Sequence, residues 1–222
     1  GQPVMAVPYN EGLLIFGFAP QPGKIFEVYD RIALGGVGHP ADVERLRMNL
    51  LDMAHLEGFN RSAQDVPSAR LLQFGIAPAL KQNFEEIQRA PYIIRMLLVE
   101  LDNEGNTNFF RMNYDGHLET FKNGTAIAGE EKVMDWLQTE IQKQPFATYS
   151  LDQALKQACK LWDESRKLET DDEAKKDIPE TLQEAFDQWY LEGAVLTEKS
   201  MRKTIYRPLS KDEIERLKSS AF

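Results

Sequence analysis

The order of strand and helix patterns along the chain predicts an α+β fold, a four-layer αββα sandwich of two antiparallel sheets flanked by helix pairs. Three observations indicate this class. Short strands come in consecutive groups with tight turns between them, long helical patterns come in tandem pairs, and the two kinds of group alternate. Strands joined by short turns pair antiparallel, and tandem helices can cover one face of a sheet.

Length and composition restrict the class of protein further. The chain has 222 residues with 42% hydrophobic and 27% charged residues, which is typical of one globular domain spanning residues 1–222. A net charge of -9 argues against a nucleic-acid partner, and no apolar run approaches the length of a membrane-spanning helix. A single cysteine and the lack of a leader pattern predict a cytoplasmic protein. Because the chain begins with Gly1 rather than Met, we expect an upstream segment.

The first half of the chain contains four expected strands and two expected helices. Strands are predicted at residues 4–7, 13–18, 25–29 and 32–37, with turns at 10–12 and 21–23. A helix is expected from Pro40, a favoured first helical residue, to residue 57, before Gly58. A second helix is expected at 68–88, bent at Pro78.

The second half repeats this order. Strands are predicted at residues 92–101, 108–114 and 125–128, and helices at 130–142 and 150–168, the latter starting from a capping box at Ser150 and Gln153. A charged insertion or connector follows at about 169–187 and is expected at the surface, with one helical turn at most. Strands at 190–197 and 204–207 and a last helix, announced by the capping box at Ser210 and Glu213, end the chain.

Three runs of residues carry a resemblance to a known family. Residues 24–38 read Lys-Ile-Phe-Glu-Val-Tyr-Asp-Arg-Ile-Ala-Leu-Gly-Gly-Val-Gly, residues 110–116 read Phe-Arg-Met-Asn-Tyr-Asp-Gly, and residues 191–196 read Leu-Glu-Gly-Ala-Val-Leu. These runs resemble two strand pairs and the penultimate strand of actinobacterial-type proteasome α subunits, which belong to the N-terminal-nucleophile hydrolase superfamily. The likeness covers residues 4–162 and 190–217, so that only the charged segment lies outside it.

The resemblance implies a subunit without catalytic residues. Proteasome β subunits cleave peptides with an N-terminal threonine whose own amine accepts the proton. Aligning the first turn puts Gln2 at that place, and neither it nor its neighbours Gly1 and Pro3 carries a hydroxyl or a thiol. Phe18 is aligned with the carboxylate expected at the end of the second strand. Both departures are typical of an α-type subunit.

The resemblance also implies partners and a binding residue. Seven identical or homologous α subunits would form the outer ring of a core particle, contact β subunits, dock an ATPase or other ring activator, and gate the entry of unfolded protein substrates. Lys24 aligns with a lysine that receives the C-terminal carboxylate of an activator, although it could also be an ordinary solvated lysine. Tyr29, Asp30 and Arg31 are either a salt-bridged structural corner or a ring contact.

Other candidate sites are weaker. Gly35, Gly36 and Gly38 lack the spacing of a phosphate-binding loop, and close sheet packing accounts for them better. His39, His55 and His117 show no metal-ligand spacing with one another or with Cys159, so neither a metal nor a cofactor is expected. Cys159 follows the apolar side of its helix, which predicts a buried core residue.

Two other functions are compatible with the same sequence. One is a divergent N-terminal-nucleophile hydrolase, a β-type threonine protease whose nucleophile is exposed by processing. The other is a proteasome-like scaffold that assembles without a proteolytic partner, for which the charged segment at 169–187 is the one indication.

Overall fold

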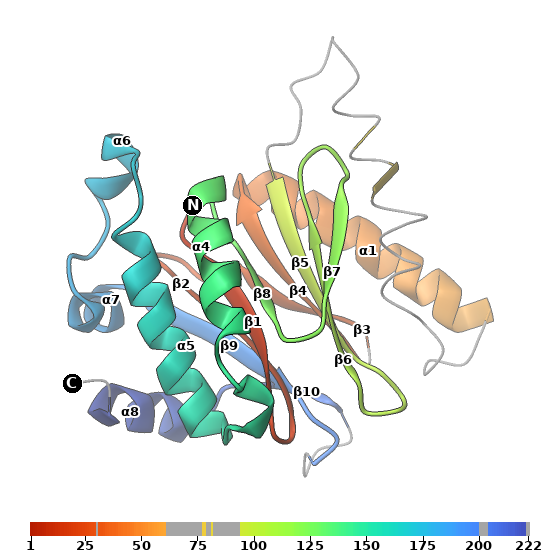
Figure 1. The fold of residues 1–222 in the computed structure, drawn as a ribbon. Coiled ribbons are helices and arrows are strands. Elements are labelled where there is room, and N and C mark those ends of the chain that lie inside the picture. Colours follow the sequence, from red (N-terminus) through yellow and green to blue (C-terminus); the bar gives the residue numbers. More distant parts are fainter. Residues whose placement is uncertain (30, 61–76, 79–80, 82–93, 200–203, 221–222) are drawn as a thin grey trace.

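Two antiparallel sheets stacked face to face form the centre of the molecule (Figure 1). The computed structural model describes residues 1–29, 31–60, 77–78, 81, 94–199 and 204–220. The first sheet has the strand order β10-β9-β2-β1-β8 and the second has the order β3-β4-β5-β6-β7. The predicted sandwich class is therefore confirmed.

The first sheet combines strands from both ends of the chain with β8 from its middle, whereas the strands of the second sheet are consecutive. The first sheet comprises β1 (Val4–Tyr9), β2 (Gly12–Ala19), β8 (Thr125–Ile127), β9 (Tyr190–Leu196) and β10 (Tyr206–Pro208). The second comprises β3 (Ile25–Tyr29), β4 (Ile32–Gly38), β5 (Ile94–Leu101), β6 (Thr107–Met112) and β7 (Leu118–Phe121). Strand β7 was not predicted, because its mostly half-exposed residues Leu-Glu-Thr-Phe do not alternate between apolar and polar.

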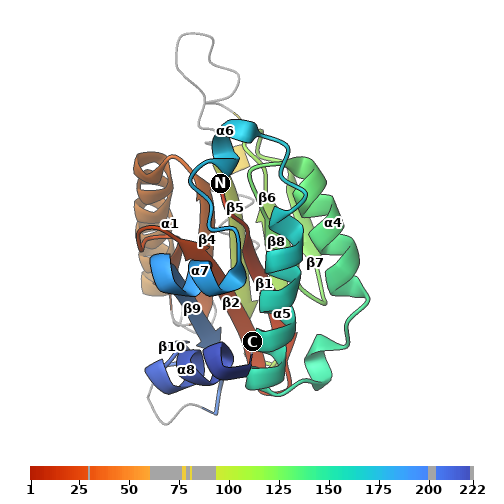
Figure 2. The same cartoon turned by 90° about the vertical axis from the view of Figure 1, so that its left-hand side faces the viewer.

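Helices cover the outer faces of both sheets (Figures 1 and 2). Helix α1 (Pro40–Asn60) lies on the second sheet, where Val43, Leu46 and Leu50 are buried with residues of β4 and β5. Helices α4 (Glu131–Gln142), α5 (Leu151–Arg166) and α8 (Lys211–Ser220) lie on the first sheet. The helix expected at 68–88 falls almost entirely outside the described residues. Among the helices that the structure describes, none is both long and apolar enough to cross a membrane.

The glycines of β4 are explained by close packing on both faces. A Cβ atom on Gly35 would lie 2.7 Å from Cγ1 of Val4, on the facing sheet, and one on Gly36 would lie 2.7 Å from Cγ1 of Val43, on α1. Both distances are shorter than carbon atoms tolerate, so any larger residue would push a layer away. The interpretation of these glycines as packing residues is confirmed.

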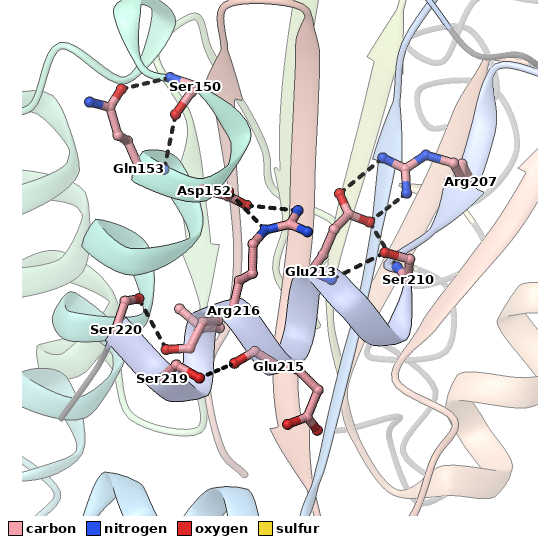
Figure 3. A network of polar contacts seen from close by, with 11 residues as sticks. Ser150, Asp152, Gln153, Arg207, Ser210, Glu213, Glu215, Arg216, Ser219 and Ser220 are labelled. Atoms are coloured by element: carbon pink, nitrogen blue, oxygen red, sulfur yellow. Dashed lines mark hydrogen bonds and ion pairs between the residues drawn. The ribbon is translucent and has the colours of Figure 1, made fainter.

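Capping boxes fix the starts of α5 and α8, as predicted. Ser150 accepts a hydrogen bond from the main-chain N–H of Gln153, and the Gln153 side chain accepts one in return. At α8, Ser210 and Glu213 make the same reciprocal pair, and Arg207 of β10 adds two hydrogen bonds to the Glu213 carboxylate, at 2.6 and 3.2 Å (Figure 3). The last helix is thereby attached to the edge of the first sheet.

The charged segment 169–187 is more structured than predicted. It contains α6 (Asp172–Lys175) and most of α7 (Leu182–Gln188). The ring of Phe186 is buried and meets Phe18 edge-on, with 5.2 Å between ring centroids. Buried Arg166 donates hydrogen bonds to the main-chain carbonyls of Pro179 and Glu180. The expectation of an exposed connector is wrong for this second half, because a single buried phenylalanine anchors an otherwise polar sequence.

The first half of the segment is held to the start of α4 by one carboxylate. Glu130 accepts hydrogen bonds from the main-chain N–H of Thr170 at 2.8 Å, from the Thr170 hydroxyl at 2.7 Å and from the N–H of Asp171 at 3.0 Å. It also shares a hydrogen bond with Glu169, and these donors lower the pKa of Glu130 to about 2. Burial and the neighbouring carboxylate raise the pKa of Glu169 to about 7. Below about pH 7, Glu169 therefore keeps a proton and donates it to Glu130.

We expect this carboxyl pair to make stability depend on pH. Folding raises the pKa of Glu169 from 4.5 to about 7, so the protonated side chain contributes to the free energy of unfolding. This contribution is complete below pH 4.5 and is lost as the pH rises through about 7. In the Glu169→Gln variant an amide N–H donates at every pH, so its advantage over the wild type in the free energy of unfolding should grow across that range. Urea unfolding at a series of pH values measures it. Substitution of the exposed Glu173 by Gln should give no such trend.

A second prediction concerns the aromatic contact under the segment. Phe18 is fully buried against Trp162, with 4.3 Å between ring centroids, as well as against Phe186. Phe18→Ala should lower the free energy of unfolding by about 3–5 kcal/mol, because it leaves a cavity at the junction of sheet, α5 and α7. Chemical denaturation measures the loss. A change below about 1 kcal/mol would contradict this placement of the ring.

Candidate functional site around Lys24

Lys24 lies at the edge of the sandwich where the chain crosses from the first sheet to the second. It directly precedes β3, and its main-chain carbonyl accepts a hydrogen bond from Gly36 of β4 at 3.0 Å. Its Nζ donates a hydrogen bond of 2.8 Å to the main-chain carbonyl oxygen of Gln2, which precedes β1. The two residues that the sequence alignment placed at the nucleophile and its assisting lysine are therefore in contact.

The Lys24 ammonium is held in an environment that disfavours its charge. Burial lowers its pKa from 10.5 to about 8, and the nearby carboxylate of Glu192 opposes this effect in part. A lysine with a pKa near neutrality is still mostly charged at pH 7 and is poorly hydrated. Such a group binds an anion more strongly than an exposed lysine does. These half-buried surroundings favour a partly desolvated lysine over an ordinary solvated one.

Glu192 was not singled out from the sequence, yet it is the acidic partner of this site. Its carboxylate accepts hydrogen bonds from three successive main-chain N–H groups, those of Gly23 and Lys24 at 3.0 Å each and of Ile25 at 3.2 Å. The available signal was an acidic residue inside the otherwise apolar run of residues 191–196. A charge in such a strand usually has a specific partner.

The side chain of Phe18 points away from Lys24. Successive residues of a strand face opposite sides of the sheet. Phe18 faces the helix layer and stacks on Trp162 of α5, whereas Gly17 lies opposite Glu192 in the register of β2 and β9. On the side of β2 that faces Lys24, position 17 is a glycine, and the nearby carboxylate comes from β9. The Phe18 side chain is therefore a core contact and not part of the Lys24 site.

Gln2 has none of the chemistry of a nucleophile. The residue is 8% exposed, and within the described part of the chain its Oε1 atom finds no hydrogen-bond donor. An N-terminal nucleophile needs a hydroxyl or a thiol next to a proton acceptor. The lysine instead contacts a main-chain carbonyl, which it can fix in place but cannot activate for attack.

Two residues of the predicted corner, Tyr29 and Arg31, contact other parts of the chain. Asp30 lies outside the described residues. The Tyr29 ring meets that of His55 on α1 at right angles, with 5.5 Å between centroids. Nη1 of Arg31 donates to the carbonyls of Leu101 and Asp102 and forms an ion pair of 2.9 Å with Glu198. These contacts favour the structural corner for Tyr29 and Arg31.

The remaining candidates are not brought together with Lys24. Cys159 is buried in α5, and burial raises the pKa of its thiol to about 12, so it is an unreactive core residue as predicted. Within the described parts of the chain, no three histidine, cysteine, aspartate or glutamate side chains are grouped so that they could hold a metal ion.

The sequence of this chain is similar to those of proteasome subunits. The family model described as Proteasome subunit matches residues 18–178. Similar proteins, each named Proteasome subunit alpha, include those of Nocardioides sp., with 30% identity over 132 residues (58% of this chain, 51% of the relative), and of Mycobacteroides abscessus, with 30% over 164 residues (71% and 59%). That of Thermomonospora curvata is 27% identical over 175 residues (76% and 74%).

The fold and the matched residues together define a sandwich of the proteasome type. The chain belongs to the proteasome subunit family, and its resemblance to α-type subunits is confirmed. The family match reaches residue 178, so the prediction that the charged segment falls wholly outside the resemblance is wrong. The matched region spans about half the length of the Nocardioides and Streptosporangium relatives.

The buried ammonium leads to a prediction about stability. Folding lowers the pKa of Lys24 from 10.5 to about 8, because the folded protein favours the neutral amine. The free energy of unfolding is therefore highest above pH 10.5 with respect to this group, and it falls as the pH falls through about 8. At pH 7 the charge is therefore a burden, and Lys24→Met should raise the free energy of unfolding by about 1–3 kcal/mol. Urea unfolding at pH 7 measures the gain. The gain in the free energy of unfolding should shrink at pH values above 8. A Lys24→Met variant that is less stable than the wild type at pH 7 would contradict the lowered pKa of Lys24.

Proposed function

We propose that this chain is a non-catalytic α-type subunit of a proteasome core particle, a threonine-protease complex. It forms the outer ring that gates substrate entry, docks activators and supports assembly of the β ring for protein degradation in the cytoplasm. Family membership and the α-type relatives support the kind of subunit. The observation that carries the proposal is the 2.8 Å contact between the Lys24 ammonium and the Gln2 carbonyl, where a catalytic subunit would present a nucleophile.

The proposed assembly follows from ring geometry. Head-to-tail contacts between identical or homologous subunits close into a ring when the rotation between neighbours divides a full turn. The resemblance to the family suggests seven copies, stacked on a ring of β subunits. Unfolded protein substrates would pass through the axial opening to reach the β subunits.

Lys24 is proposed as the anchor for an activator, an ATPase or another ring-shaped protein. A C-terminal carboxylate can form a charge-assisted hydrogen bond with an ammonium, and such bonds are shorter and stronger than neutral ones. The partly desolvated position of Lys24 strengthens this attraction, because water competes less for the charge. The Gln2 carbonyl bonded to Nζ keeps the ammonium in place before the partner arrives.

Reconstitution with the β subunit of the same organism tests the core of the proposal. Copurified chains should form stacked rings in electron micrographs, and a threonine-directed covalent inhibitor should label the β subunit and leave this chain unlabelled. Stoichiometric label on this chain would instead identify the divergent N-terminal-nucleophile hydrolase. Rings of this chain that never bind a β subunit would identify the scaffold.

A matched pair of lysine variants tests the pocket. Lys24→Ala should lower activator-stimulated degradation of an unfolded protein by about tenfold or more, because the charge-assisted bond is lost. Hydrolysis of a short peptide by the assembled particle should change much less. Lys211→Ala, which removes an exposed lysine at the start of α8, serves as the control. Equal effects of the two substitutions would contradict the role of Lys24.

A further inference from the structure

We propose that Glu192 of β9 is a positioning residue for Lys24, since it fixes the turn that carries the lysine and faces the ammonium with a negative charge. This inference rests on the proposed role of Lys24 as an anchor for a carboxylate. It adds the residue that keeps the anchor aimed and charged.

The first step of the inference is the geometry of the turn. The N–H groups of Gly23, Lys24 and Ile25 converge on one carboxylate, from 3.0 to 3.2 Å. Three successive N–H groups that point to a single place form a concave anion site, which any carboxylate of suitable reach can fill. In this chain, Glu192 fills the site from within. The turn therefore has a fixed conformation without help from a ligand.

The second step is the place of Glu192 in the first sheet. In the register of β2 and β9, Glu192 lies opposite Gly17, two positions before the end of β2. The chain leaves β2 at this edge, crosses between the sheets and enters β3 directly after Lys24. A Cβ atom at position 17 would lie 3.1 Å from the Pro3 carbonyl oxygen and 3.3 Å from Cγ2 of Val4, so the glycine allows close packing against the start of β1.

The third step is electrostatic. Burial lowers the pKa of Lys24, and Glu192 is the acidic group that raises it. Within the described residues, the charged or titratable groups near this edge include Glu192 of β9, Tyr206 of β10, Glu27 of β3 and the amino group of Gly1. Burial raises the pKa of Tyr206 to about 12, and Glu27 and Glu192 add to this effect. Because Glu192 acts on Lys24 through space without a direct hydrogen bond, the ammonium stays free to bond a carbonyl or an incoming carboxylate.

Two substitutions separate the mechanical part from the electrostatic part. Glu192→Gln removes the charge and keeps one of the two oxygens that accept from the turn, whereas Glu192→Ala removes the charge and both acceptors. The titration of Lys24 is followed by NMR of its side chain, with Lys24→Arg for assignment. Hydrogen exchange of the amides of residues 23–25 reports on the turn. Glu27→Gln is the matched control, because it removes a carboxylate that acts on Tyr206 at the same edge.

The expected results differ between the variants. In Glu192→Gln the titration midpoint of Lys24 should fall by roughly one pH unit below that of the wild type. In Glu192→Ala the three amides should in addition exchange at least about fivefold faster. Glu27→Gln should leave both readouts as in the wild type. An unchanged midpoint in Glu192→Gln, or unchanged exchange in Glu192→Ala, overturns the inference.

A peptide probe distinguishes this inference from the proposed function. The assembled rings are titrated with a short peptide that has a free C-terminal carboxylate and with the same peptide as its C-terminal amide. Wild-type rings should bind the carboxylate form more tightly than the amide form. At pH values above the lowered titration midpoint of Lys24 in Glu192→Gln, rings of that variant should show a severalfold weaker preference for the carboxylate form. Wild-type rings that bind both forms equally would refute the anchor role of Lys24, while the titration and exchange results would still decide the role of Glu192.

Discussion

The close approach of the two sheets is the constraint on which the rest of the structure depends. Gly35 allows β4 to lie against Val4 of the facing sheet, and Gly36 allows α1 to lie against the other face of the same strand. The spacing of the layers is therefore set where valine side chains pack directly on the backbone of β4. At the edge of the sandwich, this spacing lets a side chain that starts on β9 reach the main chain before β3.

The Lys24 site is built from three separate parts of the chain. The lysine lies before β3 at the edge between the sheets, its hydrogen-bond partner is the main-chain carbonyl of Gln2, and the nearby carboxylate of Glu192 comes from β9. No hydroxyl or thiol is present at residues 1–3. The Gln2 carbonyl holds the Lys24 ammonium in half-buried surroundings, which fits the role of anion anchor proposed above.

Much of the fold could be predicted from turn residues, capping boxes and apolar periodicity. Strand β3 was predicted with its observed bounds, and the capping boxes that precede α5 and α8 have the expected hydrogen bonds. Strand β7 was missed because an edge strand with half-exposed residues has no clear alternation. The burial of Phe186 was missed because an isolated apolar residue among charges does not reveal which surface it meets.

The site could be predicted only in part. The resemblance identified Lys24 and Gln2, and their contact is present. The alignment could not show which way Phe18 points, since a shift of one residue in a strand moves a side chain to the opposite face. Glu192 was not identified, because the partner of a residue 168 positions earlier is set by sheet register and not by local sequence.

The contact between Phe186 and Phe18 also bears on how the chain can vary among relatives. The segment from 179 to 188 covers an aromatic cluster that α5 and β2 would otherwise leave open on the outer side. A relative with a shorter connection before β9 must close that opening by other means, with smaller residues at the positions of Phe18 and Trp162 or with an apolar residue from elsewhere. Length of the connection and size of these side chains should therefore change together in evolution.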